Sequence, residues 1–176
     1  MDECGGLENR WAERSLGFES PPLRHYYLEN SIGRRVSREE CLEIMDQAEK
    51  AALVLCTHNE QDLTNVCSCC GCCCGWLRSL KSYERPGDHA LSSFRAGIDP
   101  SLCKACDTCG ERCQMDAIVS ENGARRVDPA RCIGCGLCLP TCPEKAVSLT
   151  ARPDAAVPPA NFVERSMRIL AERGLA

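Results

Sequence analysis

The sequence predicts an α+β fold in which a small domain with two equivalent halves follows a mainly helical, cysteine-rich region. Three observations predict it: a 29-residue internal repeat, helical patterns on either side of that repeat, and 17 cysteines among 176 residues. The chain also has only two Trp, three Tyr and three Phe. So few large hydrophobic residues indicate a thin core, and small domains with thin cores often depend on bound metals.

The internal repeat extends from residue 98 to residue 149. Ile98-Asp99-Pro100-x-x-Cys103 matches Val127-Asp128-Pro129-x-x-Cys132. The same offset of 29 residues relates three further pairs of cysteines, which are Cys106 and Cys135, Cys109 and Cys138, and Cys113 and Cys142. Chance does not align four cysteines and an Asp-Pro pair at one offset. The repeat therefore predicts a pseudo-two-fold domain whose halves share one core.

Two helices are predicted outside the repeat. Ser37 can cap a helix over residues 37–54, since Glu40 follows at the capping-box spacing and apolar residues recur every three or four positions. Asn161 and Gly174 bound a second helical pattern as start and stop signals. The chain then divides into a helical cysteine-rich region (1–80), a linker (81–97), the repeat domain (98–150), and a second linker with a C-terminal helix (151–176).

Composition and motifs exclude several classes of function. The N-terminus lacks the basic and apolar regions of a signal peptide, and no run approaches 18 apolar residues. We therefore expect a cytoplasmic protein without membrane insertion, whose cysteines are reduced metal ligands rather than disulfides. The balance of 21 basic and 25 acidic residues argues against nucleic acid as a partner. No catalytic triad, phosphate loop or dinucleotide fingerprint indicates an independent enzyme.

The repeat carries the spacing Cys-x-x-Cys-x-x-Cys-x-x-x-Cys twice, and a proline follows the second run. This pattern resembles the bacterial two-cluster ferredoxins over about residues 98–149. The resemblance implies two [4Fe–4S] clusters, with the first three cysteines of each run binding one cluster and the fourth binding the other. Carried over by position, cluster one takes Cys103, Cys106, Cys109 and Cys142, and cluster two takes Cys132, Cys135, Cys138 and Cys113.

The two runs differ in ways that bear on the clusters. We expect Gly134 and Gly136 to let the backbone approach cluster two closely. The first run has Asp107 in place of the second glycine, and its charge should lower the potential of cluster one if the side chain points inward. Gln114 stands where the second run has a proline. Cys₄ zinc sites also use Cys-x-x-Cys steps, but they pair two steps per ion across a longer gap.

A second group of cysteines places six within eight residues: Cys67, Cys69, Cys70, Cys72, Cys73 and Cys74. Six thiolates cannot all reach one metal from so short a segment, so we expect a subset to bind a third iron–sulfur cluster or zinc. Thiol redox or persulfide handling, and a metal-free segment, are the alternatives. With Gly33-Arg34, Glu39-Glu40 and His58-Asn59 upstream, this region resembles the one before the ferredoxin module in a little-characterised group of bacterial 4Fe–4S binding proteins.

The leading hypothesis is electron transfer through two [4Fe–4S] clusters, with a third metal centre within residues 67–74 and redox proteins as partners. The alternative is a ferredoxin-like subunit or module of a larger oxidoreductase, in which residues 67–74 form a catalytic or sensing site. A third hypothesis is an interaction module in which zinc at residues 67–74 serves docking. The first two favour an electron carrier or oxidoreductase subunit over an independent enzyme.

Overall fold

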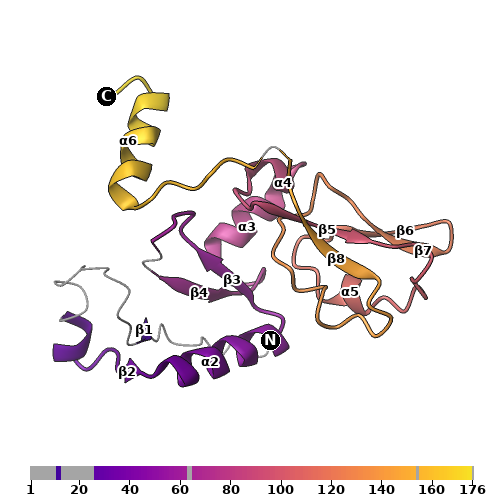
Figure 1. Cartoon of the computed structure of the whole chain (residues 1–176), viewed down its shortest axis with the longest axis horizontal. Helices are drawn as coiled ribbons and strands as arrows, with labels where there is room; N and C mark the ends of the chain where they lie inside the picture. Colours follow the sequence, from indigo (N-terminus) through magenta and orange to yellow (C-terminus); the bar gives the residue numbers. More distant parts are fainter. Residues whose placement is uncertain (1–10, 13–25, 63–64, 154, 176) are drawn as a thin grey trace. The chain divides into compact units, whose positions relative to one another are not determined.

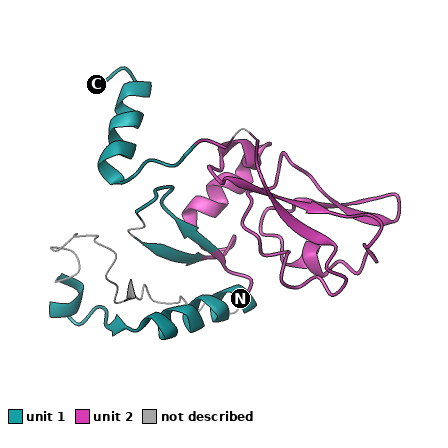
Figure 2. Cartoon of the chain, viewed as in Figure 1, with its two compact units in different colours: residues 1–51, 55–68, 157–176 teal, residues 52–54, 69–156 magenta. Residues whose placement is uncertain are grey.

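A computed structural model describes residues 11–12, 26–62, 65–153 and 155–175 (Figure 1). The chain forms two compact units (Figure 2). Unit 1 comprises residues 1–51, 55–68 and 157–176, and unit 2 comprises residues 52–54 and 69–156. Among the described residues, no helix is both long enough and apolar enough to cross a membrane.

Unit 1 is built on helix α2 (Arg38–Lys50), which follows a short parallel pair of strands, β1 (Trp11–Ala12) and β2 (Arg35–Val36). The predicted N-cap is confirmed, because the Ser37 hydroxyl accepts a hydrogen bond from the Glu40 amide at 3.1 Å. The helix ends at Lys50 rather than at residue 54. Ala52 adopts a left-handed conformation with φ of 57°, and strand β3 (Val54–Thr57) then pairs with β4 (Val66–Cys69).

Helix α6 (Phe162–Glu172) completes unit 1, and both of its predicted boundary signals are confirmed. The Asn161 side chain accepts a hydrogen bond from the Glu164 amide at 3.0 Å, and Gly174 is left-handed with φ of 66°. The helix is also tied to the loop after β3. Arg165 Nη1 lies 3.0 Å from Oε1 of the buried Glu60, an ion pair without hydrogen-bond alignment.

Unit 2 combines short helices with two small antiparallel sheets, so the predicted mixture of helices and strands is confirmed. Its helices are α3 (Gly75–Ser82), α4 (Pro86–His89) and α5 (Thr108–Glu111). Strand β5 (Phe94–Ile98) pairs with β8 (Val147–Ala151), and β6 (Ile118–Glu121) pairs with β7 (Ala124–Val127) (Figure 1). The stretch predicted to be a linker, residues 81–97, thus contains α4 and most of β5.

The two copies of the repeat have matching backbone conformations. Left-handed residues occupy three equivalent pairs of positions: Ala105 and Gly134, Asp107 and Gly136, and Asp116 and Lys145. The copies also exchange hydrogen bonds. The Asp99 amide donates to the Ala146 carbonyl at 2.9 Å, and the equivalent Asp128 amide donates to the Ala117 carbonyl at 2.7 Å. Both alanines are buried, so each copy contributes to a core that the other helps to build.

Candidate metal centres

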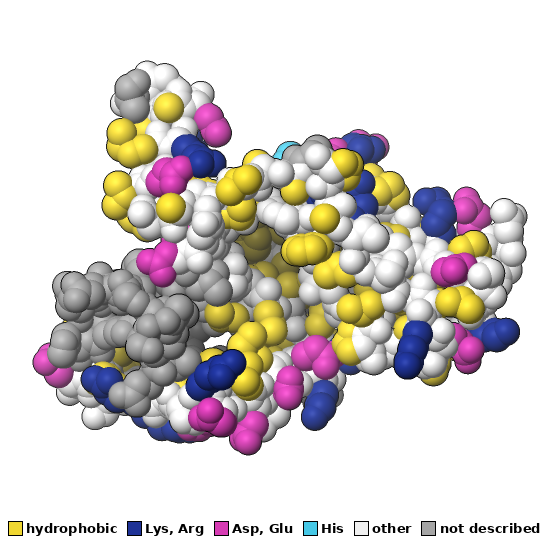
Figure 3. Space-filling model, in the orientation of Figure 1, with side chains coloured by type: hydrophobic (Ala, Val, Ile, Leu, Met, Phe, Trp, Pro, Cys, Tyr) yellow, Lys and Arg dark blue, Asp and Glu magenta, His cyan; other side chains and the backbone are white. Residues whose placement is uncertain are grey.

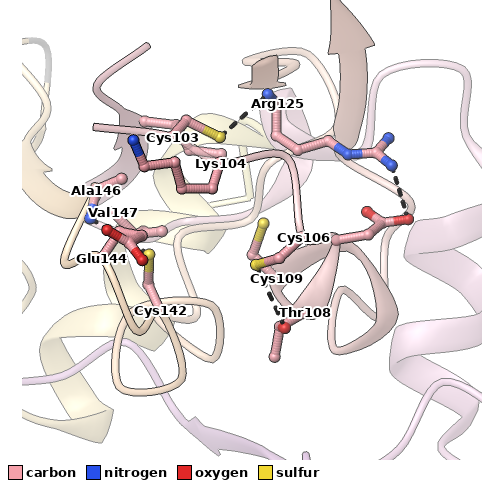
Figure 4. A pocket seen from close by; sticks show the side chains of 12 residues that line it. Cys103, Lys104, Cys106, Thr108, Cys109, Arg125, Cys142, Glu144, Ala146 and Val147 are labelled. Atoms are coloured by element: carbon pink, nitrogen blue, oxygen red, sulfur yellow. Dashed lines mark hydrogen bonds and ion pairs between the residues drawn. The ribbon is translucent and has the colours of Figure 1, made fainter. Parts of the chain in front are cut away.

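Four of the predicted ligands surround one cavity in unit 2, which we name the first cavity (Figure 4). They are Cys103, Cys106 and Cys109 from the first run and Cys142 from the end of the second. Figure 4 shows their side chains directed toward a shared space. With its open mouth included, this space has a volume of about 340 Å³.

The other four predicted ligands surround a second cavity of similar size, about 380 Å³ with its mouth. They are Cys132, Cys135 and Cys138 from the second run and Cys113 from the end of the first. Exposure follows the repeat as well. Cys106 and its equivalent Cys135 are exposed, whereas Cys109 and its equivalent Cys138 are buried. Each cavity therefore has one exposed cysteine and at least one buried cysteine, and in the second cavity Cys132 is buried as well.

The left-handed turns that direct these cysteines inward have different steric needs. A Cβ atom at Gly134 would lie 2.1 Å from the Phe94 carbonyl oxygen, so this turn packs directly against the start of β5. At Gly136 the nearest atom to such a Cβ, on Leu149, is 3.8 Å away. The equivalent of Gly136 is Asp107, which carries a side chain at φ of 67°. Close packing on β5 therefore requires glycine at position 134 and not at position 136.

Backbone amides donate to the cysteine sulfur atoms around both cavities. The Ala117 amide lies 3.2 Å from Cys113 Sγ, and the equivalent Ala146 amide lies 3.3 Å from Cys142 Sγ. Cys103 Sγ accepts two such bonds, from the amides of Ala105 at 3.4 Å and Arg125 at 3.3 Å. Donors of this kind stabilise thiolates, and they also influence the potentials of iron–sulfur clusters.

Sequence reasoning missed one residue of the first cavity, Arg125. Its Nη2 atom lies 2.9 Å from a carboxylate oxygen of Asp107, and Figure 4 marks this ion pair. The negative charge of Asp107 is therefore compensated, which opposes the lowering of potential expected from that residue. The repeat gave no signal for this role, because the position equivalent to Arg125 is residue 154, an aspartate beyond the end of the repeat.

Burial controls the protonation of the thiols at the base of each cavity. It raises the pKa of Cys138 to about 12, and the negative charges of Cys135, Cys132 and Cys113 contribute to this rise. Burial likewise raises the pKa of Cys109. Without a bound cation these buried thiols stay neutral, so a metal that binds there must displace protons. Sets of four thiols with amide donors fit iron–sulfur clusters, whose ligands are thiolates.

The dense cysteine segment brings three of its six thiols together. The sulfur atoms of Cys70, Cys72 and Cys73 all lie within 4.8 Å of one another. Cys70 and Cys72 are 2.7 Å apart, and Cys72 and Cys73 are 3.5 Å apart, measured between sulfur atoms. The sulfur atoms of Cys67, Cys69 and Cys74 do not belong to this group. Cys67 and Cys69 lie on β4, and Cys74 precedes α3.

Comparison with known proteins bears on the repeat domain. Residues 125–148 match the family model of the 4Fe-4S binding domain. A 60-residue stretch, 32% of this chain and 25% of the relative, is 38% identical to dihydromethanopterin reductase (acceptor) from Methanosarcina mazei. A 55-residue stretch, 30% of this chain and 36% of the relative, is 40% identical to an uncharacterized ferredoxin from Methanocaldococcus jannaschii.

A third relative is one subunit of the Na(+)-translocating ferredoxin:NAD(+) oxidoreductase complex from Acetobacterium woodii. It is 42% identical over 48 residues, which are 27% of this chain and 14% of the relative. The chain thus spans well under half of the length of each of these three curated relatives. The family match covers all four cysteines of the second run, and the first run repeats their spacing. The chain therefore carries a ferredoxin-type 4Fe–4S binding domain.

Proposed function

We propose that this protein transfers electrons through two [4Fe–4S] clusters, one in each cavity of unit 2. The observation that carries the proposal is the pair of similar cavities, each lined by three cysteines of one run and one of the other. Cluster one is held by Cys103, Cys106, Cys109 and Cys142, and cluster two by Cys132, Cys135, Cys138 and Cys113. When bound, such clusters supply one-electron oxidation and reduction.

The spread of the thiols favours clusters over single zinc ions in the two cavities. Tetrahedral zinc with Zn–S bonds of about 2.3 Å holds its sulfur atoms about 3.8 Å apart. Among the described residues, neither cavity contains three cysteine sulfur atoms within 4.8 Å of one another. A cube binds each thiolate at a separate iron atom and so separates the thiolates more widely. The wider spacing is what a cluster needs.

The matching halves support a pseudo-two-fold arrangement of the two clusters. Equivalent left-handed residues and the exchanged hydrogen bonds of Asp99 and Asp128 relate the two copies of the repeat. Because each run contributes ligands to both clusters, neither half completes a site alone. Metal binding and folding of this domain are then coupled.

The exposed cysteines indicate where electrons enter and leave. Cys106 and Cys135 bring each cluster close to the surface, so a redox partner can dock over either one. The chain carries a net charge of −4, and four thiolates add negative charge to each cluster. On the face in Figure 3, acidic and basic side chains are interspersed. We infer that redox proteins are the partners, as the name of the Acetobacterium woodii complex indicates for that relative.

Metal analysis tests this function directly. Protein purified without oxygen should contain about eight iron and about eight sulfide per chain, the content of two [4Fe–4S] clusters. The crossed ligand sets predict that Cys142→Ser alters the EPR signal of cluster one and Cys113→Ser that of cluster two. Cys41→Ser, a change in helix α2 at a cysteine that lines neither cavity, is the matched control. Fewer than about four iron per chain would contradict the proposal.

A second candidate function rests on the three thiols of Cys70, Cys72 and Cys73. Their sulfur atoms lie close enough to hold a metal, which supports an additional centre beside the ferredoxin-type domain. The protein is then a module of a larger oxidoreductase, with a catalytic or sensing site in the dense cysteine segment.

A further inference from the structure

Two thiols of the dense segment lie almost within bonding distance of each other. The sulfur atoms of Cys70 and Cys72 are 2.7 Å apart. Sulfur atoms around tetrahedral zinc stand about 3.8 Å apart, whereas the S–S bond of a disulfide is about 2.05 Å long. The pair is therefore spaced more closely than two ligands of one zinc ion, and a small inward movement completes a disulfide.

We propose that Cys70 and Cys72 are a reversible dithiol–disulfide pair, with a disulfide from outside the chain as the oxidant. The proposal rests on the second candidate function, because it assigns a chemistry to the sensing site of the dense segment. It does not depend on clusters in the two cavities. A metal bound at these thiols and a disulfide between them exclude each other, since both use the same sulfur atoms. In reducing compartments such disulfides are usually transient and serve catalysis or redox sensing.

The third thiol of the group, that of Cys73, is a poorer partner for Cys72. The sulfur atoms of Cys72 and Cys73 are 3.5 Å apart, farther than those of Cys70 and Cys72. Cys72 and Cys73 are also neighbours in the chain. Neighbouring Cα atoms across a trans peptide lie about 3.8 Å apart, below the roughly 4.4–6.8 Å that disulfides usually span. Gly71 separates Cys70 from Cys72, so the closer pair is also the less restricted one.

The turn between the two cysteines is built around Gly71. The Cys74 amide donates to the Cys70 carbonyl at 3.1 Å, which closes the turn before α3. The Gly71 amide donates to Gln114 Oε1 at 2.8 Å. A Cβ atom at Gly71 would lie 2.9 Å from that same oxygen, so glycine lets the turn approach Gln114 closely. The backbone between Cys70 and Cys72 is therefore held from outside the turn.

Gln114 is itself fixed at both ends of its amide group. Its Nε2 donates to the Ala52 carbonyl at 2.9 Å while its Oε1 accepts from Gly71. The equivalent residue of the second run is Pro143, whose side chain can neither donate nor accept such bonds. Groups that are held in place lose less conformational freedom when they join, which favours the bond between them. Gln114 is thus a positioning residue for the Cys70–Cys72 pair.

The exposed position of Cys72 gives an incoming disulfide, RSSR, access to the pair. The Cys72 thiolate attacks RSSR, which forms Cys72–S–S–R and releases RS⁻, and RS⁻ takes up the proton that Cys72 lost. Cys70 then loses its proton and attacks the Cys72 sulfur. The intrachain disulfide forms, and the second RS⁻ leaves with that proton as RSH. The two cysteines have lost two electrons and two protons, and RSSR has become two RSH.

Mass spectrometry of the full chain tests the pair. Protein loaded anaerobically with iron and sulfide is equilibrated with mixtures of reduced and oxidised glutathione, and its remaining thiols are then alkylated. The peptide that carries residues 67–74 should contain one intrachain disulfide, which dithiothreitol removes. Oxidised thioredoxin in place of oxidised glutathione distinguishes a protein disulfide from a small one, because the faster reaction identifies the source.

Serine variants identify the two partners. Cys70→Ser and Cys72→Ser should each lower the equilibrium constant for the intrachain disulfide by roughly tenfold or more, because the thiols that remain are farther apart or adjacent in the chain. Cys73→Ser should keep the disulfide. Cys74→Ser is the matched control, since the sulfur of Cys74 lies outside the group of three, and it should behave as the unchanged protein.

Gln114→Ala tests the support of the turn. It should lower the same equilibrium constant by roughly three- to tenfold, in favour of the mixed disulfide at Cys72, at unchanged iron content. An equilibrium constant equal to that of the unchanged protein would show that Gln114 does not position the pair.

Two results would overturn the pair itself. In one, every thiol of residues 67–74 is still alkylated after treatment with oxidised glutathione. In the other, iron or zinc that the unchanged protein retains is lost in Cys70→Ser and Cys72→Ser, and no disulfide forms. That second result leaves the second candidate function standing with a metal centre. Iron and sulfide missing from all preparations contradict the electron-transfer function alone, because the disulfide is measured separately.

Discussion

Arg125 makes two contacts at the first cavity through different parts of one residue. Its guanidinium pairs with Asp107, and its backbone amide donates to Cys103 Sγ. The side chain is 23% exposed, so this charge is partly shielded from solvent. A partly buried positive charge beside a cluster favours the reduced state, because reduction adds negative charge there.

Removal of this charge should therefore lower the potential of cluster one. We expect Arg125→Gln to shift its midpoint downward on the order of 60 mV, a factor of ten in a one-electron equilibrium. The backbone amide remains, so the Cys103 hydrogen bond is kept. The measurement is an anaerobic redox titration followed by EPR. Arg126→Gln is the matched control, since Arg126 is about half exposed and pairs with Glu121 instead. If Arg125→Gln left the midpoint potential of cluster one unchanged, Arg125 would not be a determinant of that potential.

At the scale of elements, the sequence predicts best what neighbouring residues decide. Ser37 and Asn161 cap their helices through side-chain bonds three residues along the chain, so their pattern was visible in the sequence. The pairing of β5 with β8 was not visible in the sequence, because its partners, such as Ala96 and Leu149, are far apart along the chain. The end of α2 was missed for a related reason, since the β3–β4 pair begins where the helical pattern still continues.

The same distinction applies to the candidate metal sites. The first three cysteines of each run lie around one cavity because each run folds as a local turn, whereas the place of the fourth cysteine at the other cavity was implied by the resemblance to two-cluster ferredoxins. The dense segment contains six cysteines with the same side-chain chemistry, so their spacing in the sequence did not show which of them come together. The grouping of Cys70, Cys72 and Cys73 accompanies a turn at Gly71, whose amide donates to the side chain of Gln114, a residue 43 positions away.

The contact between the second-run turn and strand β5 gives a matched pair of substitutions. Gly134→Ala would place a Cβ 2.1 Å from the Phe94 carbonyl oxygen at a left-handed φ of 70°. Gly136→Ala has a similar φ of 80° but meets its nearest atom at 3.8 Å. We expect about 1 kcal/mol of destabilisation for Gly136→Ala from backbone strain alone, and about 2–4 kcal/mol for Gly134→Ala from strain plus overpacking.

Anaerobic thermal unfolding of the iron-loaded protein, followed by its visible absorption, measures this difference. We expect a larger fall in the midpoint temperature of unfolding for Gly134→Ala than for Gly136→Ala. Equal falls for the two variants would mean that the turn is not held against β5. The pair of variants separates tertiary packing from conformational strain, because both positions have the same backbone requirement.

At the scale of the whole molecule, the ferredoxin-type domain has no half that is complete on its own. Asp99 bonds to Ala146 of the second copy, and Asp128 bonds to Ala117 of the first. Burial, and to a lesser extent the neighbouring cysteines, raises the pKa of the Cys138 thiol to about 12, so this thiol resists ionisation. Under the proposed function, bound metal would remove that cost, join the two copies and stabilise the fold.

Removal of iron should therefore unfold this domain as one unit. We expect an anaerobic chelator to abolish the cluster absorption and the protection of amides in β5, β6, β7 and β8 together, in one transition. Amide hydrogen exchange with mass spectrometry reads these strands separately from α2, which has its own cap at Ser37 and should keep its protection. The exchanged bonds of Asp99 and Asp128 require that both sheets open at the same iron content. Protection of β6 and β7 that survives complete removal of iron would show that one half folds without the metal, and would contradict the coupling of the two halves.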